Sequence, residues 1–160
     1  MDKILNLLNE NSRLTHQEIA TMINEPVEYV EKMIKEYEAK GIIKGYKAVI
    51  DYDKVQGAET TAFIELKVKP RKDTGFDETA KQVMAFEEVE SVYLMAGSFD
   101  LMVCVKGESV TDIAMFVARK LSTLEGVLAT NTHFKLRTYK ERGIVFDNLD
   151  EEQDKRSIVL

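Results

Sequence analysis

The spacing of the apolar residues changes part-way along this chain of 160 residues. From Val27 to Tyr37 apolar side chains lie three or four residues apart, which is typical of a helix with one buried face. From Thr60 to Lys69 apolar and polar residues alternate, which is the pattern of a strand with one buried face. The two patterns predict a helical N-terminal module and a C-terminal module built on a sheet.

Local signals divide the N-terminal part into three helices. An apolar stripe that starts at Ile4 predicts the first helix. Thr15 and Glu18 have the spacing of a capping box, so a second helix is expected to begin after Thr15. Pro26 suits the first turn of a third helix, and Gly41 suits the position just past its end.

The remaining segments set the module boundaries. Residues 42–50 predict a short extended hairpin, so residues 1–50 are expected to form a winged helix-turn-helix. A linker at 51–59 leads to residues 60–142, whose patterns follow the order βαββαβ of a ferredoxin-like unit, so the expected fold class is α+β. Strands are expected at 60–69, 89–96, 99–106 and 127–139, with helices at about 76–86 and 109–124. The acidic extension 143–160 is interpreted either as a solvated tail or as an arm that docks on a neighbouring subunit.

Composition excludes several classes of protein. The formal net charge of −6 argues against a surface coated with phosphate-binding charge, although a local contact with DNA stays open. Cys104 is the only cysteine, so no disulfide forms within the chain, and His16 and His133 are too far apart in sequence to suggest a metal cluster. No basic leader and no run of ~20 apolar residues occurs. We therefore expect a cytoplasmic protein with no membrane partner, no metal and no cofactor.

Two short motifs carry a resemblance to a known family. The segment from Gly41 to Tyr46 resembles the end of the recognition helix in the Lrp/AsnC (feast/famine) regulators. The segment from Ala96 to Leu101 resembles the Gly-x-x-Asp hairpin of the same family. The resemblance covers roughly residues 1–140, and residues 60–142 match the family's βαββαβ (RAM-type) ligand-binding and dimerisation domain.

The resemblance implies a sequence-specific DNA-binding transcriptional regulator that responds to an amino acid or a related small metabolite. Its implied partners are double-stranded DNA, the effector and further copies of the chain, as a homodimer that assembles to a tetramer or octamer. Phe63 would lie on the outward face of its strand and help to pair two sheets across such a dimer. Cys104 lies in an apolar strand, where we expect it to be buried and unreactive.

The third helix is the expected DNA-reading element, because a recognition helix places its N-terminal turns in the major groove. Between Glu25 and Lys40, five carboxylates against three lysines leave a net charge of −2, and Met33 stands where the family often has an arginine. Glutamate can accept a hydrogen bond from cytosine N4, and lysines can reach phosphates. The expected DNA-binding residues are Arg13, Pro26, Glu28, Tyr29, Lys32, Lys35, Lys44 and Lys47.

In this family the effector sits between subunits near the Gly-x-x-Asp hairpin. Backbone N–H groups of the hairpin would hold a carboxylate and Asp100 would pair with an ammonium, which suits a zwitterionic amino acid. Strand alternation points His133 away from the polar residues beside it. The alternative is that the glycine and the aspartate only form a tight turn. The expected effector-binding residues are Gly97, Ser98, Phe99, Asp100, Thr130 and Thr132.

Two other functions are weighed against this one. The acidic helix also fits a protein that binds an effector but no DNA and assembles with related regulators. The charges would then be ordinary helix pairs, such as Glu28 with Lys32 and Glu31 with Lys35. An enzyme is not expected, because the sequence shows no nucleophile–base pair, phosphate loop or metal cluster.

Overall fold

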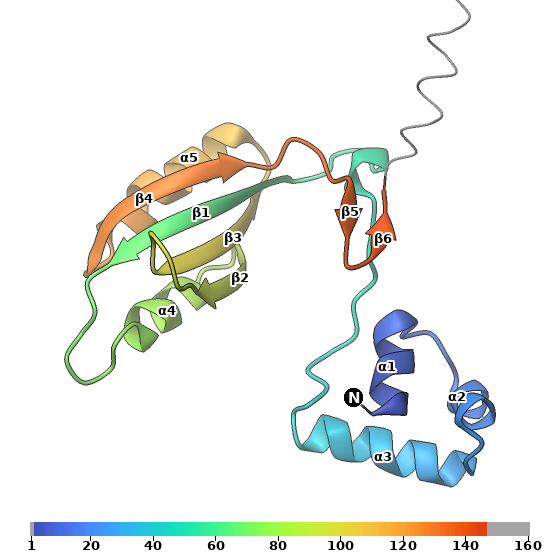
Figure 1. Cartoon of the computed structure of the whole chain (residues 1–160). Helices are drawn as coiled ribbons and strands as arrows, with labels where there is room; N and C mark the ends of the chain where they lie inside the picture. Colours follow the sequence, from blue (N-terminus) through green and yellow to red (C-terminus); the bar gives the residue numbers. More distant parts are fainter. Residues whose placement is uncertain (1, 147–160) are drawn as a thin grey trace, which may run out of the picture. The chain divides into compact units, whose positions relative to one another are not determined.

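A computed structural model describes residues 2–146 of the chain. The chain divides into two compact units, Met1–Val49 and Ile50–Leu160, and each is described by itself (Figure 1). Most of the predicted C-terminal extension, from residue 147 onward, lies outside the described residues. Within the described part, no helix is long and apolar enough to cross a membrane.

The N-terminal unit consists of three helices: α1 (Lys3–Glu10), α2 (His16–Ile23) and α3 (Val27–Ala39). The predicted capping box is confirmed, since the Glu18 backbone N–H donates to Thr15 Oγ1 at 3.2 Å and the Thr15 N–H donates to Glu18 Oε2 at 2.7 Å. The α2 helix ends at Asn24, whose φ of 56° lies in the left-handed region. The tight turn from Asn24 to Pro26 makes α2 and α3 a helix-turn-helix.

One face of each helix forms the core of this unit. Its buried side chains are Ile4, Ile19, Ala20, Val30, Ile34 and Tyr37. Gly41 follows α3 with a φ of 65°, as expected for the residue just past a helix end. The predicted hairpin at 42–50 was wrong, because this segment contains no strand. The segment between Lys44 and Ile50 makes no backbone hydrogen bond within the described residues, so it has no strand to pair with.

The C-terminal unit confirms the order βαββαβ. Its sheet contains β1 (Thr60–Val68), β2 (Val89–Leu94), β3 (Leu101–Gly107) and β4 (Val127–Phe134), and its helices are α4 (Asp77–Met84) and α5 (Val110–Arg119). The short 3₁₀ turns are η1 (Tyr52–Lys54), before the sheet, and η2 (Leu121–Thr123), after α5. The strand order is β2-β3-β1-β4, and all neighbouring strands are antiparallel. The last strand, β4, ends at Phe134, which is five residues before the strand end that the sequence predicted at Tyr139.

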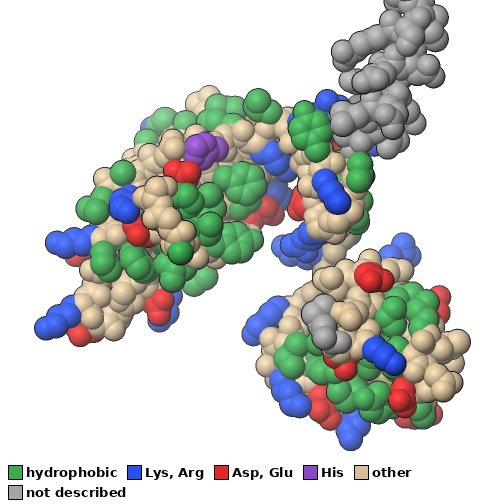
Figure 2. Space-filling view, in the orientation of Figure 1, with side chains coloured by type: hydrophobic (Ala, Val, Ile, Leu, Met, Phe, Trp, Pro, Cys, Tyr) green, Lys and Arg blue, Asp and Glu red, His purple; other side chains and the backbone are tan. Residues whose placement is uncertain are grey.

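The two faces of the sheet differ sharply. Ile64 lies opposite Val103 and Thr132, and this face packs against α4 and α5 through side chains such as Val83 and Phe116. The preceding residue of β1, Phe63, points to the other face and lies opposite Cys104 and His133. Within the described residues of this unit, no α-helix packs on this second face, which we call the open face (Figures 1 and 2). Its exposed or half-buried side chains include Phe63, Glu65, Tyr93, Met102, Asn131 and His133.

A small hairpin follows the sheet. Strands β5 (Lys140–Glu141) and β6 (Ile144–Val145) pair through a turn in which Arg142 and Gly143 have φ values of 48° and 86°. Ile144 lies opposite Glu141, and Val145 lies opposite Lys140. Two residues per strand give little stability alone, so this hairpin is the weakest sheet of the chain.

Candidate functional site

The outward face of α3 carries most of the predicted DNA-binding residues. Val30 and Ile34 bury one side of the helix, and Glu28, Lys32 and Lys35 are exposed on the opposite side. Both signs of charge lie next to one another over the surface of this unit (Figure 2). The helix is therefore held by its apolar side and presents a charged side to solvent. A shallow trough on the exposed side is lined by Glu28, Glu31, Lys32, Lys35, Glu36 and Ala39.

Three of the five acidic side chains near α3 already have partners. Glu31 Oε1 lies 3.6 Å from His16 Nδ1, and Glu36 Oε2 accepts from Lys40 Nζ at 3.0 Å. The Lys40 hydrogen bond lowers the pKa of Glu36. Glu38 Oε1 accepts from the Tyr46 hydroxyl at 3.0 Å. Three of the five carboxylates thus have a polar contact inside the unit, and the net charge of −2 is unchanged because Lys40 is already in that count.

The helix pairs weighed in the sequence are absent from the described structure. Glu28 and Lys32 are not within ion-pair distance of each other, and Glu31 faces His16 instead of Lys35. Sequence spacing missed the His16 and Tyr46 contacts, because both partners come from outside α3. Only the capping-box position of His16 hinted that it starts the neighbouring helix.

The other predicted DNA-binding residues are all exposed. Pro26 is the residue before α3 rather than its first residue, with an extended ψ of 148°. Tyr29, in the first turn, is 42% exposed. Arg13 lies in the turn between α1 and α2, and Lys44 and Lys47 follow α3 in the extended segment. The structure therefore leaves every predicted contact of this unit accessible from solvent.

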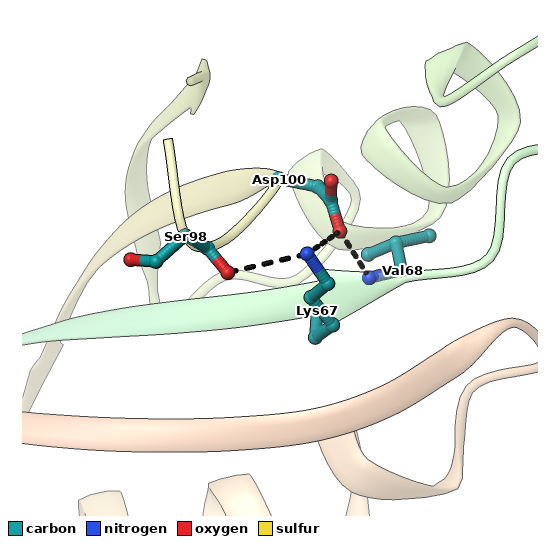
Figure 3. Close-up of polar contacts among 4 residues, drawn as sticks. All are labelled: Lys67, Val68, Ser98 and Asp100. Carbon is teal, nitrogen blue, oxygen red and sulfur yellow. Dashed lines mark hydrogen bonds and ion pairs between the residues drawn. The ribbon is translucent and has the colours of Figure 1, made fainter. Parts of the chain in front are cut away.

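The second candidate site is the turn between β2 and β3, shown in Figure 3. The Val68 backbone N–H donates to Asp100 Oδ2 at 2.8 Å, and Lys67 Nζ lies 3.9 Å from the same oxygen. Lys67 Nζ also donates to the Ser98 carbonyl at 3.2 Å. Asp100 thus ties the turn to the end of β1, and Lys67 lies close to its carboxylate.

The tip of this turn keeps unused donors. Among the described residues, the backbone N–H groups from Ala96 to Phe99 have no acceptor, although the neighbouring Met95 and Asp100 N–H groups both do. A Cβ atom added at Gly97 would meet no atom within 4 Å, so the space beside it is open. Gly97 does not use a left-handed φ, so its role is space rather than backbone strain. Free donors beside open space are a suitable setting for a carboxylate.

The predicted threonines do not meet Asp100 within one chain. Thr130 lies opposite Leu66, and Thr132 lies opposite Ile64, so both point to the helix-covered face. Thr130 Oγ1 is 3.5 Å from Ser122 Oγ of η2. Strand β1 separates β4 from β3, which places Thr130 and Asp100 about 10 Å apart across two strand spacings. A ligand that contacts both must extend across the end of β1.

The open face carries a polar cluster that the sequence did not predict. His133 Nε2 lies 3.2 Å from Glu65 Oε1, and Asn131 Nδ2 donates to Glu65 Oε2 at 3.3 Å. As expected, His133 points away from Thr132. Strand alternation alone would have placed each of these residues outward, but only the register of β1 and β4 brings them together. Nearby, burial raises the pKa of the Cys104 thiol, which agrees with an unreactive cysteine.

Comparison with known protein families assigns both units. Residues 3–44 match a family of winged helix-turn-helix DNA-binding domains, and residues 61–145 match the Lrp/AsnC ligand binding domain. The fold and these matches define a DNA-binding transcriptional regulator with a ligand-binding domain.

Individual relatives agree. The chain is 48% identical over 158 residues to YugG of Bacillus subtilis (strain 168), described as an uncharacterized HTH-type transcriptional regulator; the match covers 98% of this chain and 94% of that protein. The regulator NMB0573 of Neisseria meningitidis, solved with L-Met, is similar at 25% identity and a TM-score of 0.70, over 93% of this chain and 95% of that one. The feast or famine regulatory protein Rv3291c of M. tuberculosis, solved with L-methionine, is similar at 25% identity and a TM-score of 0.70, over 86% and 90% of the two chains. The chain belongs to the Lrp/AsnC family.

Proposed function

We propose that this regulator binds specific double-stranded DNA sequences through α3 and that an amino acid bound at the β2–β3 turn modulates this binding. The observation that carries the effector half is the row of unused backbone donors from Ala96 to Phe99 beside the Asp100 carboxylate. Donors and a carboxylate on one turn match the two charges of a zwitterion. The two relatives solved with methionine support this class of effector.

The DNA half is supported by the exposed face of α3. Arg13, Lys32, Lys35, Lys44 and Lys47 supply cations for phosphates, and all five are exposed. Contacts within the unit hold three of the nearby carboxylates in place, so they do not project freely toward DNA. Because its proposed target is chromosomal DNA, we expect the protein in the cytoplasm.

We further propose that two copies pair through their open faces. Phe63 is 37% exposed and Tyr93 is 55% exposed. Both are large aromatic side chains that remain exposed because no α-helix of the unit covers this face. Covering such a face removes apolar surface from water and is favourable by about 25 cal/mol per Å². Pairing also offers a way to complete an effector site that one chain leaves split between Asp100 and Thr130. Dimers of this kind would assemble further to a tetramer or octamer.

The test is binding of the purified protein to fragments of its own upstream DNA across a salt series, with and without a mixture of amino acids. We expect tight binding that weakens with salt, because lysines release counterions from phosphates, and a shift in affinity when the effector is present. A folded oligomer that binds no DNA at low salt would contradict the proposal. It would favour the alternative of an effector-binding partner of related regulators, which isolation with such a regulator would test.

A further inference from the structure

The first turns of α3 present one carboxylate and one ammonium on the same outward line. Glu28 and Lys32 are four residues apart, so they lie one turn apart on the helix surface. Both are exposed, and they lie on the side of α3 opposite the buried Val30 and Ile34. These are the turns that a recognition helix inserts into the major groove.

Glu28 differs from the other carboxylates of the helix in having no partner. Glu31, Glu36 and Glu38 are engaged by His16, Lys40 and Tyr46 respectively. In the described residues, neither Glu28 nor Lys32 makes a hydrogen bond or an ion pair. Lys32 acts on Glu36 only through its charge, which helps to lower the pKa of that carboxyl, so neither side chain has to break a hydrogen bond to reach a ligand.

A carboxylate in the major groove is repelled by phosphates unless it meets a donor. Among the exposed base edges of the groove, the N4 amino group of cytosine is the donor that Glu and Asp typically accept from. Lysine is complementary, because guanine O6 and N7 are acceptors and phosphates are anionic. The pair is therefore matched to a C·G base pair or to a cytosine beside a phosphate.

We propose that Glu28 is a specificity-determining residue that accepts a hydrogen bond from cytosine N4, with Lys32 beside it as the donor to guanine or phosphate. This inference rests on the proposed DNA binding through α3. The acidity of the helix then becomes a source of sequence preference. Guanine and thymine offer a carboxylate no amino donor in the major groove, and adenine places its N7 acceptor beside its N6 amino group.

The experiment uses the full-length protein and DNA sites selected by it from random duplexes. Binding of wild type and Glu28→Gln is measured by fluorescence anisotropy on the best site and on variants in which each C·G pair is replaced in turn. We expect wild type to lose affinity about ten-fold or more at one cytosine. The glutamine variant should lose that preference and favour adenine there, because glutamine pairs with adenine N6 and N7.

Glu36→Gln is the matched control. This variant removes the same charge from the same helix. Glu36 lies about two turns beyond Glu28, and its carboxylate accepts a hydrogen bond from Lys40. The control should raise affinity for all duplexes to a similar extent and leave the base preferences unchanged. Circular dichroism of both variants verifies that the helices remain folded.

The outcomes distinguish a failure of the Glu28 inference from a failure of the proposed DNA binding. If Glu28→Gln raises affinity uniformly and keeps the preference for cytosine, Glu28 only repels DNA and the inference is overturned. If wild type selects no duplex and binds none at low salt, the proposed DNA-binding function fails, and the inference fails with it.

Discussion

The outward face of α3 and the open face of the sheet expose different mixtures of side chains. On α3 the exposed positions are charged, with Glu28, Lys32 and Lys35 projecting from a helix whose core side is apolar. On the open face two aromatic side chains, Phe63 and Tyr93, are exposed, and the other side of the sheet is already covered. They lie on the same face as the polar cluster of Glu65, Asn131 and His133. Exposed lysines on a hydrated face suit a polyanion, and large exposed aromatic side chains suit another protein surface. Under the proposed function, one chain therefore carries DNA recognition on one unit and subunit pairing on the other.

A charge placed on the open face should break this contrast most strongly. Phe63→Glu would bury an unpaired carboxylate in the proposed interface beside Glu65, so we expect dimerisation to weaken roughly 100-fold or more. Sedimentation of the variant over a concentration series measures this. Met84→Glu is the control, because Met84 is 57% exposed on α4 and lies away from the open face. Unchanged self-association of Phe63→Glu would contradict pairing through this face.

Removing one charge at the β2–β3 turn tests the effector site. In Asp100→Asn the amide oxygen can still accept from the Val68 N–H, so the turn should keep its structure. The loss of the charge-assisted contact to an ammonium should lower affinity for the amino acid about ten-fold or more. Calorimetric titration with individual amino acids measures the loss. Equal affinities of the two proteins would leave Asp100 with its structural role only.

Neutralising a lysine outside the first turns sharpens the distinction between phosphate contact and base reading. Lys35→Gln should weaken binding several-fold on all sequences and reduce the slope of log K against log salt by about one. Anisotropy titrations at several salt concentrations give both quantities. Lys54→Gln is a suitable control, since Lys54 lies in the other unit and pairs with Asp51. A loss confined to one DNA sequence would instead make Lys35 a base-reading residue.

The smallest expected effect is on the stability of α2, the helix before α3. Thr15→Ala removes the N-cap of α2 and should reduce the free energy of unfolding by about 1 kcal/mol, measured by thermal denaturation. Thr15→Ser keeps the hydroxyl and should restore most of this loss.

The capping box also has a pH signature. The hydrogen bond from the Thr15 backbone N–H lowers the pKa of Glu18. The stability contributed by Glu18 is therefore present above its unfolded pKa and is lost as pH falls through its lower folded pKa. Stability of Glu18→Gln should depend less on pH in this acidic range than that of wild type. Parallel pH dependences of the two proteins would contradict a folded capping box.

Elements with strong local signals were predictable. The Thr15 capping box, the alternation in β1 and the Gly41 terminus depend on residues close in sequence, and the structure confirms all three. The hairpin at 42–50 failed because an apolar run beside a glycine resembles a strand, yet a strand needs a pairing partner and this segment has none in the described chain. Local pattern predicts an extended backbone but not its partner.

The same distinction between local signals and long-range contacts applies to the candidate sites. Periodicity was sufficient to put Glu28 and Lys32 outside the helix core and to send His133 and Thr132 to opposite faces of the sheet, because side-chain direction follows from helix and strand geometry. Two other features depended on contacts between residues distant along the chain. One is which carboxylates of α3 have partners, and the other is the position of β1 between Asp100 and Thr130. Such contacts are set by packing and strand register, which no local pattern encodes.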